Sequence, residues 1–251
     1  MSNPAEPPGR EHRWPVIELR QYTLHPGRRD ELITLFDREF IESQEAVGMT
    51  VLGQLRDLDD ADRFVWLRGF ASMASRALAL ASFYDGPVWQ MHREAANATM
   101  IDSDNVLLLR PAQANEAMAI ETWQRPDSHT HTPRAGGLLA VVCPLATAPD
   151  AHGVETFVQA LAPVLAHDGG ALVGCYATAG SANTFRRLPV REGEQVLVGL
   201  ARFDELDACS RVAAELKARP HWLDSLGSDA ATRLIAPPQV LRLAPTARSR
   251  F

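Results

Sequence analysis

The chain has 251 residues, a formal net charge of −6 and 46% hydrophobic residues, which suits one large core or two small domains. The acidic balance, with Lys217 as the single lysine, argues against the basic stripe of a nucleic-acid-binding protein. No run approaches the roughly 20 apolar residues of a membrane helix, and residues 1–14 lack the apolar segment of a signal peptide. We therefore expect neither a nucleic-acid nor a membrane partner.

The three cysteines, Cys143, Cys175 and Cys209, are widely spaced and sit in apolar surroundings. This pattern is typical of buried free thiols. No CxxC motif or Cys/His ladder indicates a metal or redox centre. We expect a cytoplasmic protein with no metal and no cofactor.

The first half alternates strand and helix patterns in a recognisable order. A tail over 1–14 precedes a strand at 16–24, whose residues alternate in polarity. Leu32, Leu35, Phe36 and Phe40 recur at helical spacing within 25–48. The remaining elements are a hairpin with strands at 49–57 and 63–70, a helix at 72–84, a helix that starts at Asp85-Gly86-Pro87, a turn at 101–105 and a strand at 105–111.

The second half runs through the same order of elements. Its strands are predicted at 137–145, 171–178, 195–203 and 239–245, and its helices at 154–170 and 205–218. Each half is thus β-α-β-β-α-β, the ferredoxin-like order. The predicted domains are 15–112 and 137–246, joined by a linker at 113–136 and followed by a tail at 247–251.

A four-stranded sheet with helices on one face leaves its other face uncovered. Two such sheets in one chain can cover each other. Strands with apolar residues on both faces, such as FVWL and VLLL, favour burial on two sides. The predicted fold class is α+β, with two tandem ferredoxin-like units packed sheet to sheet as a pseudo-dimeric α/β barrel.

Three stretches of the first half resemble the NIPSNAP family: ELRQYTLHPGRRDEL, VLGQLRDLDDADRFVWLRGF and FYDGPVWQMHREAANATMIDSDNVLLLRP. The resemblance implies the dimeric α/β-barrel superfamily, in which tandem fusions occur. That superfamily contains cofactor-independent monooxygenases, lactone isomerases, polyketide cyclases, haem enzymes and proteins without known chemistry. The resemblance therefore implies a small organic molecule as the binding partner and is compatible with a homo-oligomer of pseudo-dimers. It identifies no catalytic residue, because proteins of one fold carry out unrelated reactions.

His92 is the first candidate for chemistry. On the predicted helix it falls among Val88, Ala95, Ala96 and Thr99, on the apolar side. It is either a core histidine bonded to the backbone or an acid/base that lines a pocket. The aligned position of the second half is Ser225, so a site that uses His92 belongs to the first half.

Charged and aromatic residues on the first sheet are the second candidates. Alternation puts Glu18, Arg20 and Tyr22 on one face of their strand, and Trp66 with Arg68 on one face of another. Gln54 shares a face with Arg56. Buried charges must be paired or bind a ligand, so the set is either a Glu–Arg network that joins the two sheets or a site for an anionic or polyketide-like ligand.

These residues predict a small-molecule enzyme of a biosynthetic pathway, with cofactor-independent acid/base chemistry of the isomerase, cyclase or monooxygenase type. His92 would be the acid/base, Tyr22 a second proton relay, and Arg20 or Arg68 the stabiliser of an enolate. Trp66, Trp89 and Gln54 would contact the substrate. The alternatives are a non-catalytic ligand-binding or interaction protein and, ranked below it, a haem protein with His92 as axial ligand.

Overall fold

The computed structural model describes residues 14–112, 125–128, 130, 132–218 and 233–251. The first unit contains β1 (Val16–Leu24), α1 (Arg29–Leu35), the π-helix η1 (Phe36–Phe40), α2 (Ile41–Glu45), β2 (Thr50–Asp57), β3 (Arg63–Phe70), α3 (Met73–Tyr84), α4 (Pro87–Asn97), β4 (Met100–Asp102) and β5 (Val106–Pro111). The second contains β6 (Gly137–Leu145), α5 (Ala151–His167), β7 (Ala171–Thr178), β8 (Gln195–Phe203), α6 (Leu206–Ala218) and β9 (Gln239–Pro245).

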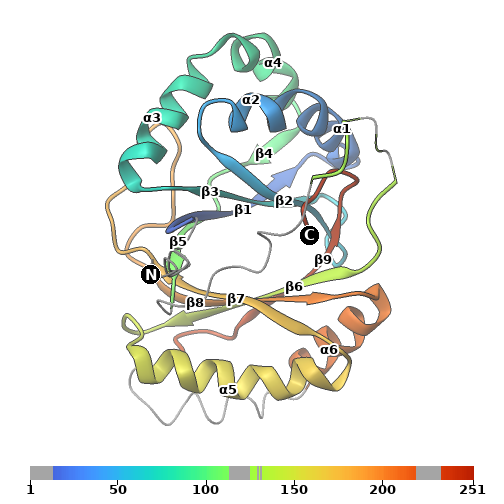
Figure 1. Cartoon of the computed structure of the whole chain (residues 1–251), viewed down its shortest axis with the longest axis vertical. Coiled ribbons are helices and arrows are strands. Elements are labelled where there is room, and N and C mark those ends of the chain that lie inside the picture. The colour runs from blue at the N-terminus through green and yellow to red at the C-terminus, as the bar shows by residue number, and fades with distance from the viewer. Residues whose placement is uncertain (1–13, 113–124, 129, 131, 219–232) are drawn as a thin grey trace, which may run out of the picture.

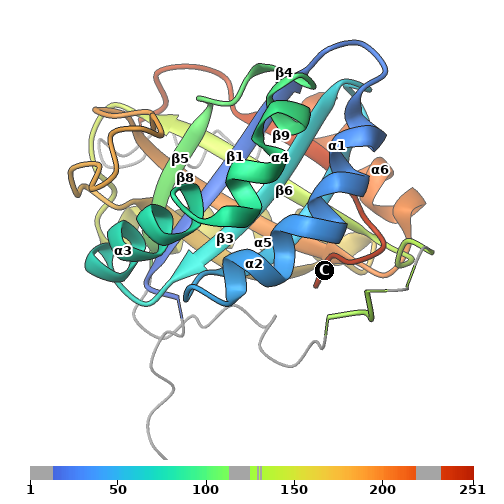
Figure 2. The ribbon, with the colours of Figure 1, turned by 90° about the horizontal axis from the view of Figure 1, so that it is seen from above.

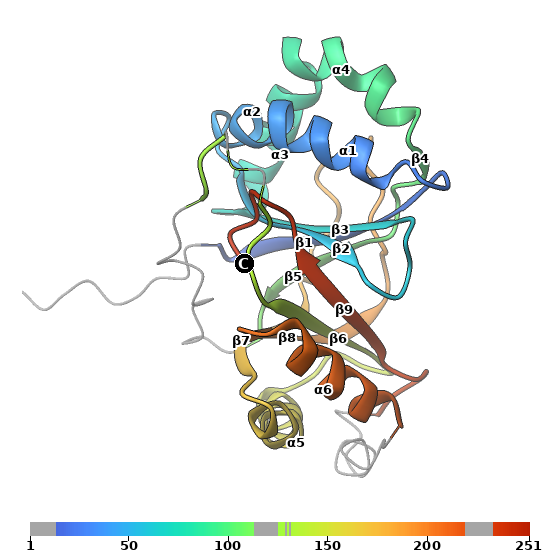
Figure 3. The same cartoon turned by 90° about the vertical axis from the view of Figure 1, so that its right-hand side faces the viewer.

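The two sheets close into one antiparallel barrel. The first sheet has the order β2-β3-β1-β5 and the second β7-β8-β6-β9, and the pairs β2–β9 and β5–β7 join their edges. Helices α1 to α4 cover the outside of the first sheet, and α5 and α6 cover the second (Figure 1, Figure 3). Figure 2 looks down on α1 to α4, with β1 and β3 beneath them. The predicted pseudo-dimeric α/β barrel is confirmed, and closure leaves the eight barrel strands without a free edge.

Strand alternation divides the apolar residues into an inner core and two outer cores. Ile17 and Leu19 point into the barrel and join side chains from both sheets. Their neighbours Glu18 and Arg20 therefore point outward, under the helices of the first unit. In the second unit the same outward positions are apolar, with Leu139, Val141 and Cys143 under α5 and α6.

Two local predictions need correction. The single helix expected over 25–48 is interrupted by the π-helix η1, and such turns are frequent at functional sites. The turn expected at 101–105 includes part of a short strand, β4, which pairs with β1.

The predicted C-terminal tail at 247–251 is wrong, because Arg248, Ser249 and Phe251 are buried. The Phe251 ring lies over Gly53, where a Cβ atom would come within 2.3 Å of it. Trp14, at the end of the predicted N-terminal tail, is likewise buried, with its ring against Gly69. Residues 1–13, most of the linker and Ser225 lie outside the described residues.

Candidate functional site

A buried charge cluster lies on the helix-covered face of the first sheet. The antiparallel register of β1 and β3 sets Glu18 opposite Arg68 and Arg20 opposite Trp66. The Glu18 carboxylate accepts hydrogen bonds from Arg20 Nη1 at 2.7 Å, Arg68 Nε at 2.8 Å and Arg76 Nε at 2.6 Å. All four side chains are completely buried. One carboxylate is thus shared by three guanidinium groups.

Arg76 links this cluster to the second unit. It lies on the buried side of α3, and its Nη1 donates to Asn183 Oδ1 at 3.0 Å and to Thr184 Oγ1 at 3.1 Å. Both acceptors belong to the loop between β7 and β8, which rises beside α3 (Figure 1). The Glu–Arg network exists, but it joins the first sheet to its own helices and to this loop rather than to the second sheet.

The arginines keep the Glu18 carboxyl ionised. Burial alone would raise its pKa, but Arg68, Arg20 and Arg76 outweigh burial and hold the pKa well below its usual range. Arg68 also donates from Nη1 to Gln44 Oε1 at 3.0 Å and lies 3.6 Å from Met49 Sδ. The cluster is therefore a fixed, fully charged group inside the first unit.

A small cavity lies directly beside the cluster. Its volume is about 30 Å³, enough for a single water molecule. The residues that line it are mostly aromatic: Tyr22, Leu32, Phe36, Phe40, Gln44, Trp66, Phe83, Tyr84, Trp89, Ala96 and Met100.

Tyr22 and Trp66 connect the cavity to the charges behind it. Tyr22 Oη accepts a hydrogen bond from Arg20 Nε at 2.9 Å. The guanidinium carbons of Arg20 and Arg68 lie 5.5 and 5.0 Å from the Trp66 ring centroid, within cation–π range. Burial raises the pKa of the Tyr22 phenol against the pull of Arg20. A neutral phenol that accepts from Arg20 has its own hydrogen to offer to a molecule in the cavity.

The loop between β7 and β8 packs against Tyr84, which lies in the wall of this cavity. Phe185 stacks on Tyr84, with ring centroids 5.9 Å apart and an interplanar angle of 27°. Tyr84 in turn contacts Trp89 at 4.8 Å. Arg187 binds both carboxylate oxygens of Asp85 at 2.7 and 3.0 Å. The second unit therefore supports a wall residue of a cavity whose lining belongs to the first unit.

The structure brings together most, but not all, of the residues that the sequence suggested. Tyr22, Trp66 and Trp89 line the cavity, and Arg20 and Arg68 lie behind Tyr22 and Trp66. These positions agree with a pocket between the sheet and the helices of the first unit. Their roles stay predictions.

Two predicted residues lie elsewhere. Gln54 points to the other side of η1, where its Nε2 donates to Asp37 Oδ1 at 3.3 Å. His92 is half-buried at the edge of α4, with Nε2 3.5 Å from Glu39 Oε2. It is not among the residues that line the cavity, so its role as acid/base also stays a prediction.

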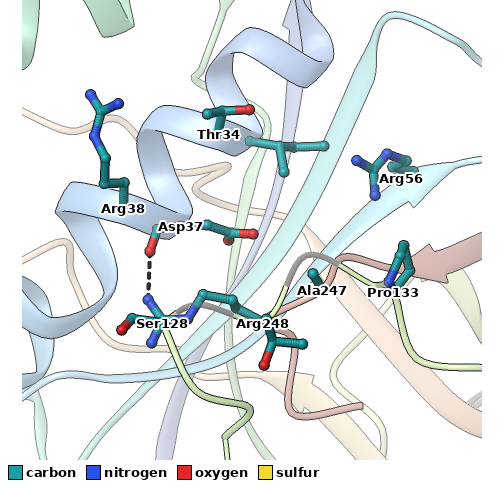
Figure 4. A pocket seen from close by; sticks show the side chains of 10 residues that line it. Thr34, Asp37, Arg38, Arg56, Ser128, Pro133, Ala247 and Arg248 are labelled. Atoms are coloured by element: carbon teal, nitrogen blue, oxygen red, sulfur yellow. Dashed lines mark hydrogen bonds between the residues drawn. The ribbon is translucent and has the colours of Figure 1, made fainter.

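A second, wider cavity of about 610 Å³ lies between η1, the linker and the C-terminal segment (Figure 4). Arg56 on its wall is bound to Asp30, and Arg248 to Glu42. Burial raises the pKa of Asp37 to about 6, although Arg248 opposes the shift. Because its arginines are already paired, this groove is a weaker candidate site than the aromatic cavity.

The described residues contain no group of three or more His, Cys, Asp or Glu side chains that could hold a metal ion. Burial raises the pKa of the Cys143 thiol to about 12, so it is no ready nucleophile. A cavity of about 30 Å³ with His92 outside its lining does not fit a porphyrin. None of the described helices is long and apolar enough to cross a membrane.

Fold and site together define a two-unit α/β barrel whose first unit holds an aromatic cavity beside a buried charge cluster. Residues 17–115 match the sequence model of the NIPSNAP family, and the first unit is a NIPSNAP family domain. Comparison with curated protein sequences found no match.

Two solved structures agree with the fold over the full length. An anthrone oxidase-like protein is 12% identical with a TM-score of 0.51, and covers 96% of this chain and 97% of its own. A candidate monooxygenase from Fusobacterium nucleatum is 9% identical with a TM-score of 0.50, and covers 93% of each chain. A NIPSNAP family protein of unknown function from Agrobacterium tumefaciens is 20% identical with a TM-score of 0.38, and covers 42% of this chain and 94% of its own. At 12% and 9% identity, the likeness to the first two concerns the fold alone.

Sequence reasoning missed Arg76, Gln44 and the loop residues Asn183 and Phe185. A signal existed for Arg76, because it lies three, four and seven residues before Ala79, Leu80 and Phe83, on the buried side of its helix. No comparable signal existed for the loop, because its contact with α3 joins residues more than 100 positions apart.

Proposed function

We propose that the first unit binds a small organic molecule in the aromatic cavity and promotes cofactor-independent proton transfer there. The observation that carries the proposal is the position of Tyr22, in the cavity wall with Arg20 bonded to its oxygen at 2.9 Å. A phenol that donates into a cavity backed by fixed positive charge is suited to stabilise a developing enolate or phenolate.

In this mechanism the substrate's carbonyl oxygen accepts the Tyr22 hydrogen. Arg20 and Arg68 favour the enolate, because positive charge behind a cavity of low dielectric constant lowers the pKa of the substrate's acidic C–H bond. The proton leaves to water, and Trp66 and Trp89 contact the apolar body of the substrate. Isomerisation, cyclisation or oxygenation can follow from such an enolate, in keeping with an enzyme of a biosynthetic pathway in the cytoplasm.

Anthrone is a suitable first probe, because its CH₂ group is acidified by a neighbouring carbonyl and a protein of the same fold is called anthrone oxidase-like. The measurement is the exchange of the anthrone CH₂ hydrogens for deuterium in D₂O, followed by NMR. Loss of the Tyr22 proton donor in Tyr22→Phe should slow the protein-dependent exchange by about 10²-fold or more. Tyr176→Phe makes the same change inside the barrel, outside the cavity lining, and serves as the matched control.

The small size of the cavity favours one alternative, a non-catalytic ligand-binding or interaction protein. A ring can enter the 30 Å³ space only if half-buried Tyr84 or Trp89 moves aside. Exchange that is no faster with wild-type protein than without it would support this alternative. Exchange that is equally fast in wild type and Tyr22→Phe would remove Tyr22 from the mechanism.

A further inference from the structure

The buried cluster of the first unit contains more positive than negative charge. Arg20, Arg68 and Arg76 share the single carboxylate of Glu18, and no other carboxylate of the described residues forms an ion pair with any of them. Arginine stays protonated in proteins. The remaining contacts of these three side chains are neutral, such as Gln44 and Asn183. The cluster thus holds an excess of two positive charges.

Such an excess is costly in a place that water does not reach. All four side chains of the cluster have no exposed surface, and an isolated buried charge is strongly unfavourable unless it is paired. Three buried donors that face this region also lack a partner among the described residues: Arg20 Nη2, Arg68 Nη2 and Trp66 Nε1. Native proteins leave few such groups unsatisfied, and each calls for an explanation.

The second unit shows that the fold does not require these charges. At the corresponding face of its sheet, Leu139, Val141 and Cys143 pack against α5 and α6. None of the buried charged side chains among the described residues lies in this core. A structural role would be served equally well, or better, by such apolar packing. The excess charge of the first unit is therefore best explained by something that binds there.

We infer that the ligand of the first unit is an organic anion with a planar apolar body, such as an aromatic carboxylate or phenolate. This inference rests on the proposed function, because it assigns the substrate class of the same cavity. The anionic group takes hydrogen bonds from Tyr22 and Trp66 at the floor of the cavity. Arg20 and Arg68 act on it from behind, and the ring lies between Phe36, Phe40 and Trp89. With an excess of two charges, one remains to stabilise an enolate that forms on the same molecule.

The test supplies the missing negative charge from the protein itself. Met49 is buried, and its Sδ lies 3.6 Å from Arg68 Nη1. Met49→Glu places a carboxylate there, and Met49→Gln has the same shape without the charge. Each is made in the full chain and its thermal midpoint is measured. Binding of benzoate and of neutral benzamide is followed by tryptophan fluorescence, because Trp66 and Trp89 line the cavity.

Wild type and Met49→Gln should bind benzoate at least about tenfold more tightly than benzamide. Met49→Glu should melt above Met49→Gln and lose this preference, because the new carboxylate competes with the ligand. A midpoint of Met49→Glu at or below that of Met49→Gln would overturn the inference, as would an unchanged preference. Equal binding of both probes to wild type would also overturn it while leaving the cavity as a ligand site. Binding of neither probe would count against the proposed function as well.

Discussion

Replacement of Glu18 by Gln is the sharpest perturbation of the first unit's interior. The change keeps the shape of the side chain and removes the one carboxylate that Arg20, Arg68 and Arg76 share at 2.6–2.8 Å. Three buried guanidinium groups then face each other without an anion. Breaking a single buried ion pair in this way costs about 3–5 kcal/mol, and here three pairs lose the same partner.

We therefore expect Glu18→Gln to lower the free energy of unfolding by at least about 3–5 kcal/mol. At roughly 2–4 °C per kcal/mol for a domain of this size, the thermal midpoint should fall by about 6–20 °C. Urea unfolding at pH 7 measures the free energy and heating measures the midpoint, both followed by circular dichroism. The control is Glu31→Gln, because Glu31 is 52% exposed and its pair with Arg28 at 2.6 Å is worth about 1 kcal/mol or less.

A loss of less than about 1 kcal/mol for Glu18→Gln would refute the reasoning, because it would mean that the three arginines are compensated by something other than Glu18. The double variant Glu18→Gln, Arg68→Met gives a second check. It removes one unpaired charge together with the carboxylate, so it should be more stable than Glu18→Gln alone. If it is less stable, repulsion among the arginines is not the cause of the loss.

Three further outcomes follow. The folded pKa of Asp37 is raised from 3.8 to about 6, so stability should fall as pH rises from about 4 to 6. Asp37→Asn should remove this pH dependence and stabilise the protein at pH 7 by about 1–2 kcal/mol. The upper bound is about 3 kcal/mol, from 1.4 kcal/mol per pKa unit. A free energy of unfolding that does not change with pH in wild type would contradict this. His92→Ala should cost less than about 1 kcal/mol, because its pair with Glu39 is 3.5 Å long and partly exposed, and a larger loss in urea unfolding would restore the core-histidine interpretation. Phe185→Ala should cost about 3–5 kcal/mol and make tryptophan fluorescence more accessible to acrylamide, since Phe185 is 9% exposed and stacks on Tyr84; unchanged quenching would show that the loop does not shield the cavity wall.

Local sequence patterns were enough to place most elements of the barrel. The strands expected at 16–24, 63–70, 137–145 and 195–203 have those bounds in the structure. Alternation within such strands depends on neighbouring residues and on geometry that every strand shares. The same rule correctly put Glu18, Arg20 and Tyr22 on one face and showed that this face is polar in the first unit alone.

The exceptions are places where distant segments meet. The expected tail at 247–251 is polar and short, but Phe251 fills the space above Gly53 and joins the inner core of the barrel. His92 falls on the apolar side of its helix in a helical projection. However, α4 contacts η1 at that point, so the side chain lies beside Glu39 instead of in the cavity.

The sequence by itself determined the two β-α-β-β-α-β units, the side of the first sheet that carries charge, and the family of the first unit. These features depend on periodicity and on residues close together in the chain. The tertiary structure decided how the charges are matched. It set Glu18 among three arginines, brought Arg76 against Asn183 of the other unit, and turned Gln54 away from the cavity. These contacts depend on strand register and on packing between residues more than 100 positions apart in the sequence. No local sequence pattern encodes such contacts.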